Sequence, residues 1–303
     1  MANEAVRAAT RRADPRLASL KRMAIVPALN EEGGVGRVID EIRAFDPELE
    51  IVVVDDGSGD RTSEVAAAAG AHVLRLPFNL GIGGAVQTGF RYAFENGYQL
   101  VVRVDGDGQH DPSQLGALLE PVLAGEADIA VGSRFAGVSG YRQTVSRSLA
   151  NRVLAWTASL VTRQRVTDPS SGFQVLNRRA IALFAADYPH EFPEVEATVM
   201  VARHRLRRVE VPVSMRQRLA GRSSIDFVHS VYFMTKVLLA LFVGLFQSVG
   251  EPMVPPGAPS FDASRDFAIL RERAEPSPEG FDPSDTAGPS PAPPAETDRV
   301  EER

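Results

Sequence analysis

The first hundred residues repeat one pattern: a short apolar run rich in β-branched residues, then a polar turn, then a segment with helical spacing. The four apolar runs are Met23–Val26, Glu50–Val54, His72–Leu76 and Leu100–Val104. Strands that are apolar throughout and alternate with helices are typical of a parallel sheet covered by helices on both faces. The pattern therefore predicts an α/β fold with a mostly parallel sheet.

The same alternation continues to about residue 213, with less regular spacing. The further elements it predicts are helix Gln114–Leu123, strand Asp128–Val131, helix Val145–Val161, strand Gln174–Leu176, helix Arg178–Phe184, a helix ending near His204, and strand Val209–Val213. The last strand contains Pro212, which cannot donate a ladder hydrogen bond, so we expect that strand at an edge of the sheet. Trp156 is expected to anchor its helix in the core.

The segment Val228–Gln247 is apolar on almost every side. Its uninterrupted apolar run is about half of the ~20 residues that a membrane-spanning helix needs. Three interpretations remain open: a helix lying in the membrane interface, a helix packed in a homodimer interface or in the core, and a true span. The interfacial helix is favoured. We therefore predict that residues 227–249 form a helix separate from a globular domain of residues 22–226.

Composition sets the two ends of the chain apart from this domain. The net charge is −6, but residues 251–303 alone contribute −7 and hold 11 of the 21 prolines, which predicts a disordered acidic tail over 250–303. The domain has no basic excess of the kind that nucleic-acid binders show. Residues 1–21 lack the apolar core of a signal peptide and are expected to be a flexible leader. The absence of cysteine excludes thiolate sites and fits a reducing cytoplasm.

Polar residues gather at the points where the apolar runs end. They are Asn30 and Glu31, Asp55 and Asp56, Asn79, and Asp105 and Asp107. In isolation, Asp105-Gly106-Asp107 favours a solvated turn over a site. Because the carboxyl ends of parallel strands meet at one edge of the sheet, four such clusters favour a shared site. Paired carboxylates there suit Mg²⁺ or Mn²⁺ that holds substrate phosphates.

Other site classes fit the sequence less well. The five histidines have no zinc-ligand spacing, and no phosphate-binding loop ending in Gly-Lys-Ser/Thr is present. Gly81-Ile82-Gly83-Gly84 approaches a dinucleotide fingerprint, but Val86 takes the place of the third glycine. A nicotinamide-dependent oxidoreductase and a non-catalytic module that recruits partners through its tail therefore remain as weaker alternatives.

Seven motifs in this order resemble family 2 glycosyltransferases of GT-A fold, in the polyprenyl-phosphate branch that includes dolichyl-phosphate mannose synthase. They are Val26–Glu31, Val54–Ser58, Asn79–Gly83, Asp105–Pro112, Gly132–Phe135, Asp168–Phe173 and Arg218–Ser223. The resemblance covers about residues 22–246. It implies an inverting transferase that moves a hexose from a nucleotide sugar, such as GDP-mannose or UDP-glucose, in the building of envelope glycans.

The resemblance also assigns the donor nucleoside to residues at the first two strand ends. Pro27, Ala28 and Glu31 correspond to the contacts after the first strand. Asp56, with Asp55 beside it, corresponds to the carboxylate that reads the base. One position departs from the pattern: a lysine that often precedes the Gly-x-Gly turn is Asn79 here, which puts one contact to the donor phosphates in doubt.

The resemblance assigns binding of the metal and of the phosphates to the later motifs. Asp105 and Asp107 match the pair that binds Mg²⁺ or Mn²⁺, and Gln109 matches the neighbour that completes this shell. Arg134 and Arg218 match cations that hold the phosphates of donor and acceptor. Divalent metal and arginine together stabilise the charge that develops on a diphosphate leaving group.

The acceptor decides whether a general base is needed. A lipid phosphate is already charged at neutral pH, since its second pKa is about 6. A hydroxyl acceptor, as in glycan or glycolipid synthesis, must lose a proton to a carboxylate. Glu196 is the candidate, with Asp168 behind it, and stabilisation of its own helix N-terminus is the alternative role. The prediction is a polyprenyl-phosphate acceptor, catalysis by Asp107, Glu196 and Arg218, and peripheral attachment to the cytoplasmic face of the membrane.

Overall fold

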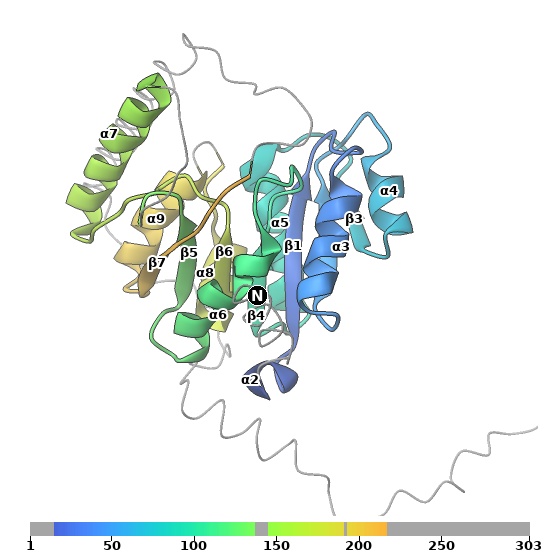
Figure 1. Ribbon diagram of the computed structural model, residues 1–303, viewed down its shortest axis with the longest axis horizontal. Coiled ribbons are helices and arrows are strands. Elements are labelled where there is room, and N and C mark those ends of the chain that lie inside the picture. Colours follow the sequence, from blue (N-terminus) through green and yellow to red (C-terminus); the bar gives the residue numbers. More distant parts are fainter. Residues whose placement is uncertain (1–14, 137–144, 191–192, 217–303) are drawn as a thin grey trace, which may run out of the picture.

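The computed structural model describes residues 15–136, 145–190 and 193–216, with helices packed against a seven-stranded sheet (Figure 1). The strands are β1 (Arg22–Ala28), β2 (Glu50–Asp55), β3 (His72–Arg75), β4 (Leu100–Arg103), β5 (Ile129–Ser133), β6 (Gln174–Asn177) and β7 (Arg208–Pro212). The helices are α2 (Pro15–Ala18), α3 (Val35–Phe45), α4 (Thr62–Ala68), α5 (Gly81–Glu95), the short η1 (Pro112–Gln114), α6 (Leu115–Leu123), α7 (Val145–Thr162), α8 (Arg178–Ala186) and α9 (Pro193–Arg203).

The sheet is mostly parallel, as predicted. Its strand order is β3-β2-β1-β4-β6-β5-β7, and β6 alone among these seven strands runs antiparallel to its neighbours. The other six carboxyl ends therefore open onto one edge of the sheet, which also receives the chain entering β6. The strand β7 is an edge strand, and its Pro212 pairs with Ser133 at the last position of the ladder, as the proline led us to expect.

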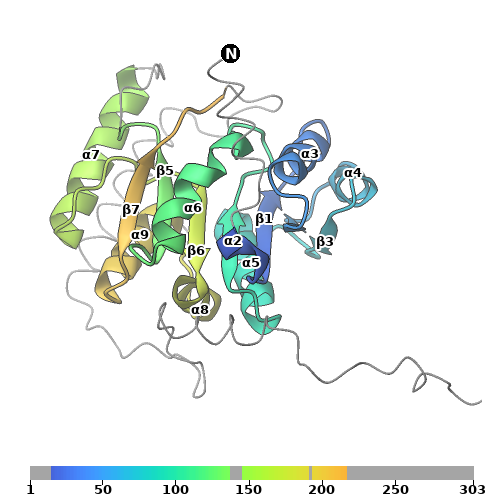
Figure 2. The same cartoon turned by 60° about the horizontal axis from the view of Figure 1, so that its bottom comes forward.

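Two apolar layers cover the sheet because successive strand residues face opposite sides. In β1, Ala24 and Val26 face a cluster that contains the apolar sides of α3 and α6. Met23 and Ile25 face a second cluster that contains those of α5 and α8. Gly89 lets α5 pack closely against β1, since a Cβ atom at this position would lie 2.6 Å from Cγ2 of Ile25. Figures 1 and 2 both show α7 along the β7 side and α4 beside β3.

A cluster of ion pairs and hydrogen bonds stabilises the amino end of β5. This end lies at the edge of the sheet opposite the carboxyl ends of the parallel strands. Asp128 is fully buried and accepts hydrogen bonds from the Arg207 amide at 2.8 Å and from Asn177 Nδ2 at 2.9 Å. Arg179 pairs with it at 3.3 Å. Burial alone would raise the pKa of Asp128, but these hydrogen bonds lower it overall. The carboxylate is thus a structural anion.

The structure corrects two expectations from the sequence. The prediction that residues 1–21 form a flexible leader is wrong for the last part of that range. Leu17 and Leu20 are buried against the first apolar layer and hold α2 there. Trp156 is not a core residue: its side chain is 67% exposed on α7. Among the described residues no helix is long and apolar enough to cross a bilayer. The segment Val228–Gln247 and the tail lie outside the described residues.

Candidate active site

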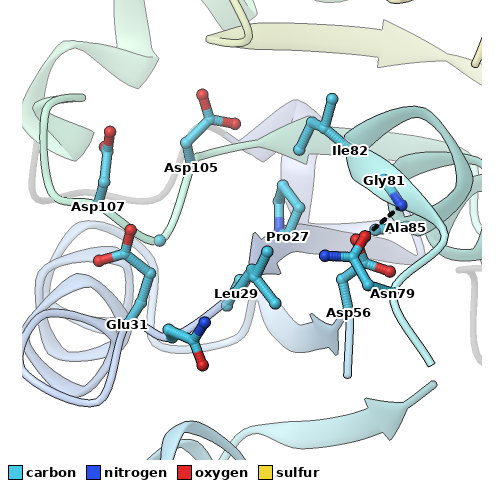
Figure 3. A pocket seen from close by; sticks show the side chains of 13 residues that line it. Pro27, Leu29, Glu31, Asp56, Asn79, Gly81, Ile82, Ala85, Asp105 and Asp107 are labelled. Atoms are coloured by element: carbon cyan, nitrogen blue, oxygen red, sulfur yellow. Dashed lines mark hydrogen bonds between the residues drawn. The ribbon is translucent and has the colours of Figure 1, made fainter. Parts of the chain in front are cut away.

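A cavity of about 480 Å³ lies at the carboxyl ends of β1, β2 and β4 and at the start of α5 (Figure 3). Its lining residues are Pro27, Ala28, Leu29, Asn30, Glu31, Asp56, Asn79, Gly81, Ile82, Ala85, Asp105, Gly106 and Asp107. This volume is in the range of pockets that enclose small ligands. The clusters predicted from four strand ends therefore meet in one cavity.

Hydrogen bonds between two loops fix the residues that follow β1. The Asn30 amide donates to Ser58 Oγ at 2.9 Å, and the amide of Gly59 donates to Asn30 Oδ1 at 2.9 Å. Asn30 has a φ of 54°, a left-handed conformation that asparagine tolerates better than most residues. The Glu31 amide donates to Thr62 Oγ1 at 2.8 Å, which holds Glu31, only 8% exposed, at the cavity wall.

The two consecutive aspartates after β2 have different positions. Asp55 is fully buried, does not line the cavity, and accepts hydrogen bonds from the Ser58 amide at 2.8 Å and from the Ser63 hydroxyl. It shapes its own loop. Asp56 lines the cavity, and its Oδ1 accepts from the Leu80 amide at 2.7 Å. Burial raises the pKa of Asp56, and backbone hydrogen bonds partly offset the rise.

The Asp105-Gly106-Asp107 turn is held against the end of β1. The Gly106 amide donates to the Pro27 carbonyl at 3.2 Å, and a Cβ atom at Gly106 would lie 3.1 Å from that oxygen. The amide of Gln109 donates to Asp107 Oδ1 at 3.0 Å. Figure 3 shows the carboxylates of Glu31, Asp105 and Asp107 on one side of the cavity, and Asp56 with Asn79 on the other.

This donor set fits a divalent metal that is shared with a substrate. Among the described residues, no group of three or more His, Asp or Glu side chains forms a complete metal cage. Mg²⁺ and similar hard ions commonly take one or two carboxylates, several waters and substrate phosphates. Asp105 and Asp107 could hold such an ion. Gln109 does not line the cavity, and its carbonyl accepts from the Arg216 amide at 2.9 Å.

Sequence reasoning missed a buried arginine beneath this turn. Arg103 is 1% exposed, and its Nη2 donates to Glu194 Oε1 at 2.8 Å while its Nη1 donates to the Tyr188 hydroxyl at 3.2 Å. Its Nε lies 3.4 Å from Asp105 Oδ1. Burial alone would lower the pKa of Arg103, but the surrounding anionic groups raise it. The available signal was an arginine inside the apolar run Leu100–Val104.

Two residues pack against Asp105 from the far side of the turn. Buried His110 accepts the Asp105 amide on Nδ1 at 3.1 Å and stacks on Phe173, with ring centroids 4.9 Å apart. Burial lowers the pKa of His110 and favours its neutral form. Gly172 leaves room for the carboxylate, since a Cβ atom there would lie 2.7 Å from Asp105 Oδ2.

Of the two predicted phosphate cations, Arg134 is described, and it does not line the cavity. Arg134 follows β5 and forms a two-point ion pair with fully buried Asp168, with Nε and Nη2 at 2.7 and 2.6 Å from the carboxylate. Its Nη2 also donates to Ser170 Oγ at 2.7 Å. Asp168 is thus engaged in a structural pair. Arg218 lies outside the described residues.

The first turn of α9 carries the predicted base. Glu196 is half-buried and does not line the cavity. Glu194, two residues earlier, contacts Arg103 at 2.8 Å. Residues two apart on a helix point about 200° from each other, so the two carboxylates occupy different faces of α9. The structure therefore connects Glu194 to the Asp105 turn through Arg103.

Comparison with known proteins identifies the family. A model of glycosyl transferase family 2 matches residues 23–184. The undecaprenyl-phosphate mannosyltransferase of Micrococcus luteus is 34% identical over 68% of this chain and 88% of its own length. The polyprenol monophosphomannose synthase of Mycolicibacterium smegmatis is 30% identical over 68% of this chain and 81% of its own length.

Solved structures agree on the fold. Glucosyl-3-phosphoglycerate synthase from Mycobacterium tuberculosis, in complex with Mn²⁺, UDP and glucosyl-3-phosphoglycerate, superposes with a TM-score of 0.57. The two are 22% identical over 78% of this chain and 84% of the synthase, so the likeness confirms the GT-A fold alone. The chain is a glycosyltransferase that belongs to family 2, in its polyprenyl-phosphate branch.

Proposed function

We propose that this enzyme transfers a hexose, with inversion, from a nucleoside diphosphate sugar to a polyprenyl phosphate, and that a divalent metal assists the transfer. The observation that carries the proposal is the meeting of Asp105 and Asp107 with Asp56 and Glu31 around one cavity. The two relatives named for undecaprenyl-phosphate and polyprenol mannosyl transfer support this acceptor class and make mannose the first sugar to test.

The two sides of the cavity suit the two halves of the donor. Asp56 offers a buried carboxylate that can accept hydrogen bonds from a base, and Leu29 and Ile82, which are 39% and 44% exposed, offer apolar contact to it. Asp105 and Asp107 would hold the metal against the diphosphate, where it would neutralise charge on the leaving group. The start of α5, at Gly81, adds backbone amides and the positive end of a helix dipole.

A polyprenyl-phosphate acceptor reduces the chemistry required of the protein. Its phosphate oxygen is already anionic near neutral pH and can attack the sugar without a strong base. The protein then has to orient the donor, exclude water and stabilise the departing diphosphate. Arg134 and Arg218 remain the proposed phosphate contacts, and contact with Arg134 would have to accommodate its pair with Asp168.

The acceptor also sets the proposed location. We place the enzyme at the cytoplasmic face of the membrane, with Val228–Gln247 lying on the surface from which a lipid phosphate is presented. Its pairing into a homodimer is a competing role for that segment. Vesicle flotation of the full chain and of a variant that ends at residue 226 separates them, since dimerisation alone would leave flotation unchanged.

The decisive assay is transfer of radiolabelled mannose or glucose from GDP-mannose or UDP-glucose to polyprenyl phosphate, with Mn²⁺, Mg²⁺ or EDTA. We expect transfer that EDTA abolishes and that Asp107→Ala lowers by about a hundredfold or more. Transfer in EDTA, or full activity of Asp107→Ala, would refute the mechanism.

A second candidate is transfer to a hydroxyl acceptor, for which Glu196 in the first turn of α9 is the predicted base. Glu196→Gln separates the two: a mild loss of activity supports the phosphate acceptor, and a near-complete loss supports a hydroxyl acceptor that needs a base. A thermal-shift comparison of NADH with UDP and GDP plus Mn²⁺ tests the oxidoreductase alternative.

A further inference from the structure

The buried guanidinium of Arg103 lies between two carboxylates at unequal distances. Its Nη2 is 2.8 Å from Glu194 Oε1, whereas its Nε is 3.4 Å from Asp105 Oδ1. Charge-assisted hydrogen bonds between such groups are usually 2.7–2.9 Å long. Among the described residues, the buried Nε has no hydrogen-bond acceptor. The arginine is therefore fully engaged with Glu194 and only loosely engaged with Asp105.

The surroundings leave Arg103 few alternatives. Its side chain is 1% exposed, so water cannot replace a lost anion. Its other contact, the Tyr188 hydroxyl at 3.2 Å, is neutral. Gly172 comes so close that a Cβ atom there would lie 2.9 Å from Nη2 and 2.7 Å from Asp105 Oδ2. If Glu194 lost its charge, Asp105 would be the remaining carboxylate that pairs with Arg103 among the residues the structure describes.

We propose that Glu194 is a positioning residue for the metal site: by pairing with Arg103 it prevents this arginine from drawing the Asp105 carboxylate away from the cavity. The inference rests on the proposed function, in which Asp105 and Asp107 bind the metal. Glu194 touches neither the metal nor the substrate in this scheme. It acts through Arg103, and it makes α9 part of the support of a turn about 90 residues earlier in the chain.

The proposal predicts an unusual pattern in a double-mutant comparison. Glu194→Gln keeps the shape of the side chain but removes its charge, so Arg103 should close the 3.4 Å gap and compete with the metal for Asp105. Loss of such a supporting contact typically weakens metal affinity by about 10–100-fold. Removal of the competitor as well, in Arg103→Met/Glu194→Gln, should restore affinity to within about threefold of wild type.

The experiment is a Mn²⁺ titration of the full-length chain in excess UDP or GDP, followed by calorimetry or by the electron paramagnetic resonance signal of free Mn²⁺. Glu194→Asp keeps the charge and should stay within about threefold of wild type, which covers the case in which the double variant does not fold. Glu64→Gln is the matched control, because Glu64 also lies in the first turn of a helix. It should leave Mn²⁺ affinity unchanged.

Each outcome decides the question. Weaker Mn²⁺ binding by Glu194→Gln with recovery in the double variant supports the role. Where the double variant does not fold, retained affinity in Glu194→Asp takes the place of that recovery. Wild-type affinity of Glu194→Gln overturns it, as does a double variant at least as weak as the single one, because a merely structural contact would show no rescue. Asp107→Ala separates the two levels: if it also leaves Mn²⁺ affinity unchanged, the metal site of the proposed function fails.

Discussion

Replacement of Gly172 by alanine would press a methyl group against the Asp105 carboxylate. The new Cβ atom would lie 2.7 Å from Oδ2 and 2.9 Å from Oδ1, whereas ordinary contact begins at 3.4 Å. Relief of the shorter contact requires a shift of about 0.7 Å. The methyl group cannot move toward Arg103 instead, since Nη2 of Arg103 would already lie 2.9 Å from it. The carboxylate or the Gly172 backbone must move.

This displacement can be compared with what a metal site tolerates. Metal–oxygen distances in functional sites vary by about 0.2 Å, so a shift of several tenths of an ångström is disruptive. Misplacement of about 1 Å in an active site can cost about a hundredfold in rate. We expect Gly172→Ala to lower kcat/KM by about ten- to a hundredfold, or roughly 1.4–2.7 kcal/mol of transition-state stabilisation. The overpacking should cost about 1–3 kcal/mol of unfolding free energy.

The assay is sugar transfer to polyprenyl phosphate at increasing Mn²⁺, with urea unfolding measured in parallel. Gly59→Ala is the control at the same edge of the sheet, because a Cβ atom there would meet only Asn30 Oδ1, at 3.9 Å. The reasoning would be refuted by a Gly172→Ala enzyme with wild-type kcat/KM and Mn²⁺ dependence. A loss of equal size in Gly59→Ala would show that the effect is not specific to the Asp105 contact.

Three further predictions test neighbouring parts of the structure. Asp56→Asn keeps an oxygen acceptor but loses charge, so calorimetry should find nucleotide affinity about tenfold lower without a lower thermal midpoint; unchanged affinity would exclude Asp56 from base recognition. Arg134→Ala leaves Asp168 buried and unpaired and should cost about 3–5 kcal/mol in urea unfolding, less if Asp168 is also replaced. Asp128 has a lowered folded pKa, so its stabilisation is present above pH ~4 and lost as the pH falls further. Asp128→Asn should therefore cost about 1–3 kcal/mol at pH 7 and less at pH 2, and a pH-independent cost would contradict the charge argument.

The sheet and the edge that carries the site were predictable because both follow from local pattern. Apolar runs interrupted by helical spacing require a parallel sheet, and a parallel sheet brings its carboxyl ends together whatever the details of packing. Asp56, Asp105 and Asp107 could thus be assigned to one cavity before any coordinates. The chemistry of paired carboxylates then limited the ligands to hard cations with phosphates.

Contacts between residues distant in the chain were not predictable. Trp156 has the spacing of a core residue on its helix, yet it is 67% exposed because α7 lies at the β7 side of the sheet. Leu17 lies in a stretch that reads as a frayed leader, yet it packs into the apolar layer. The local pattern alone does not separate Asp55 from Asp56, whereas in the structure Asp56 lines the cavity and Asp55 binds the amide of Ser58 in its own loop.

The sequence by itself determined the fold class, the family motifs and the identity of the carboxylates at Asp105 and Asp107, because periodicity and residue chemistry are written into adjacent positions. Only the tertiary structure decided what supports those carboxylates. Arg103, Gly172 and Glu194 reach the turn from β4, from the loop before β6 and from α9, and their approach depends on how these elements pack. No local pattern encodes a distance between residues about 90 positions apart.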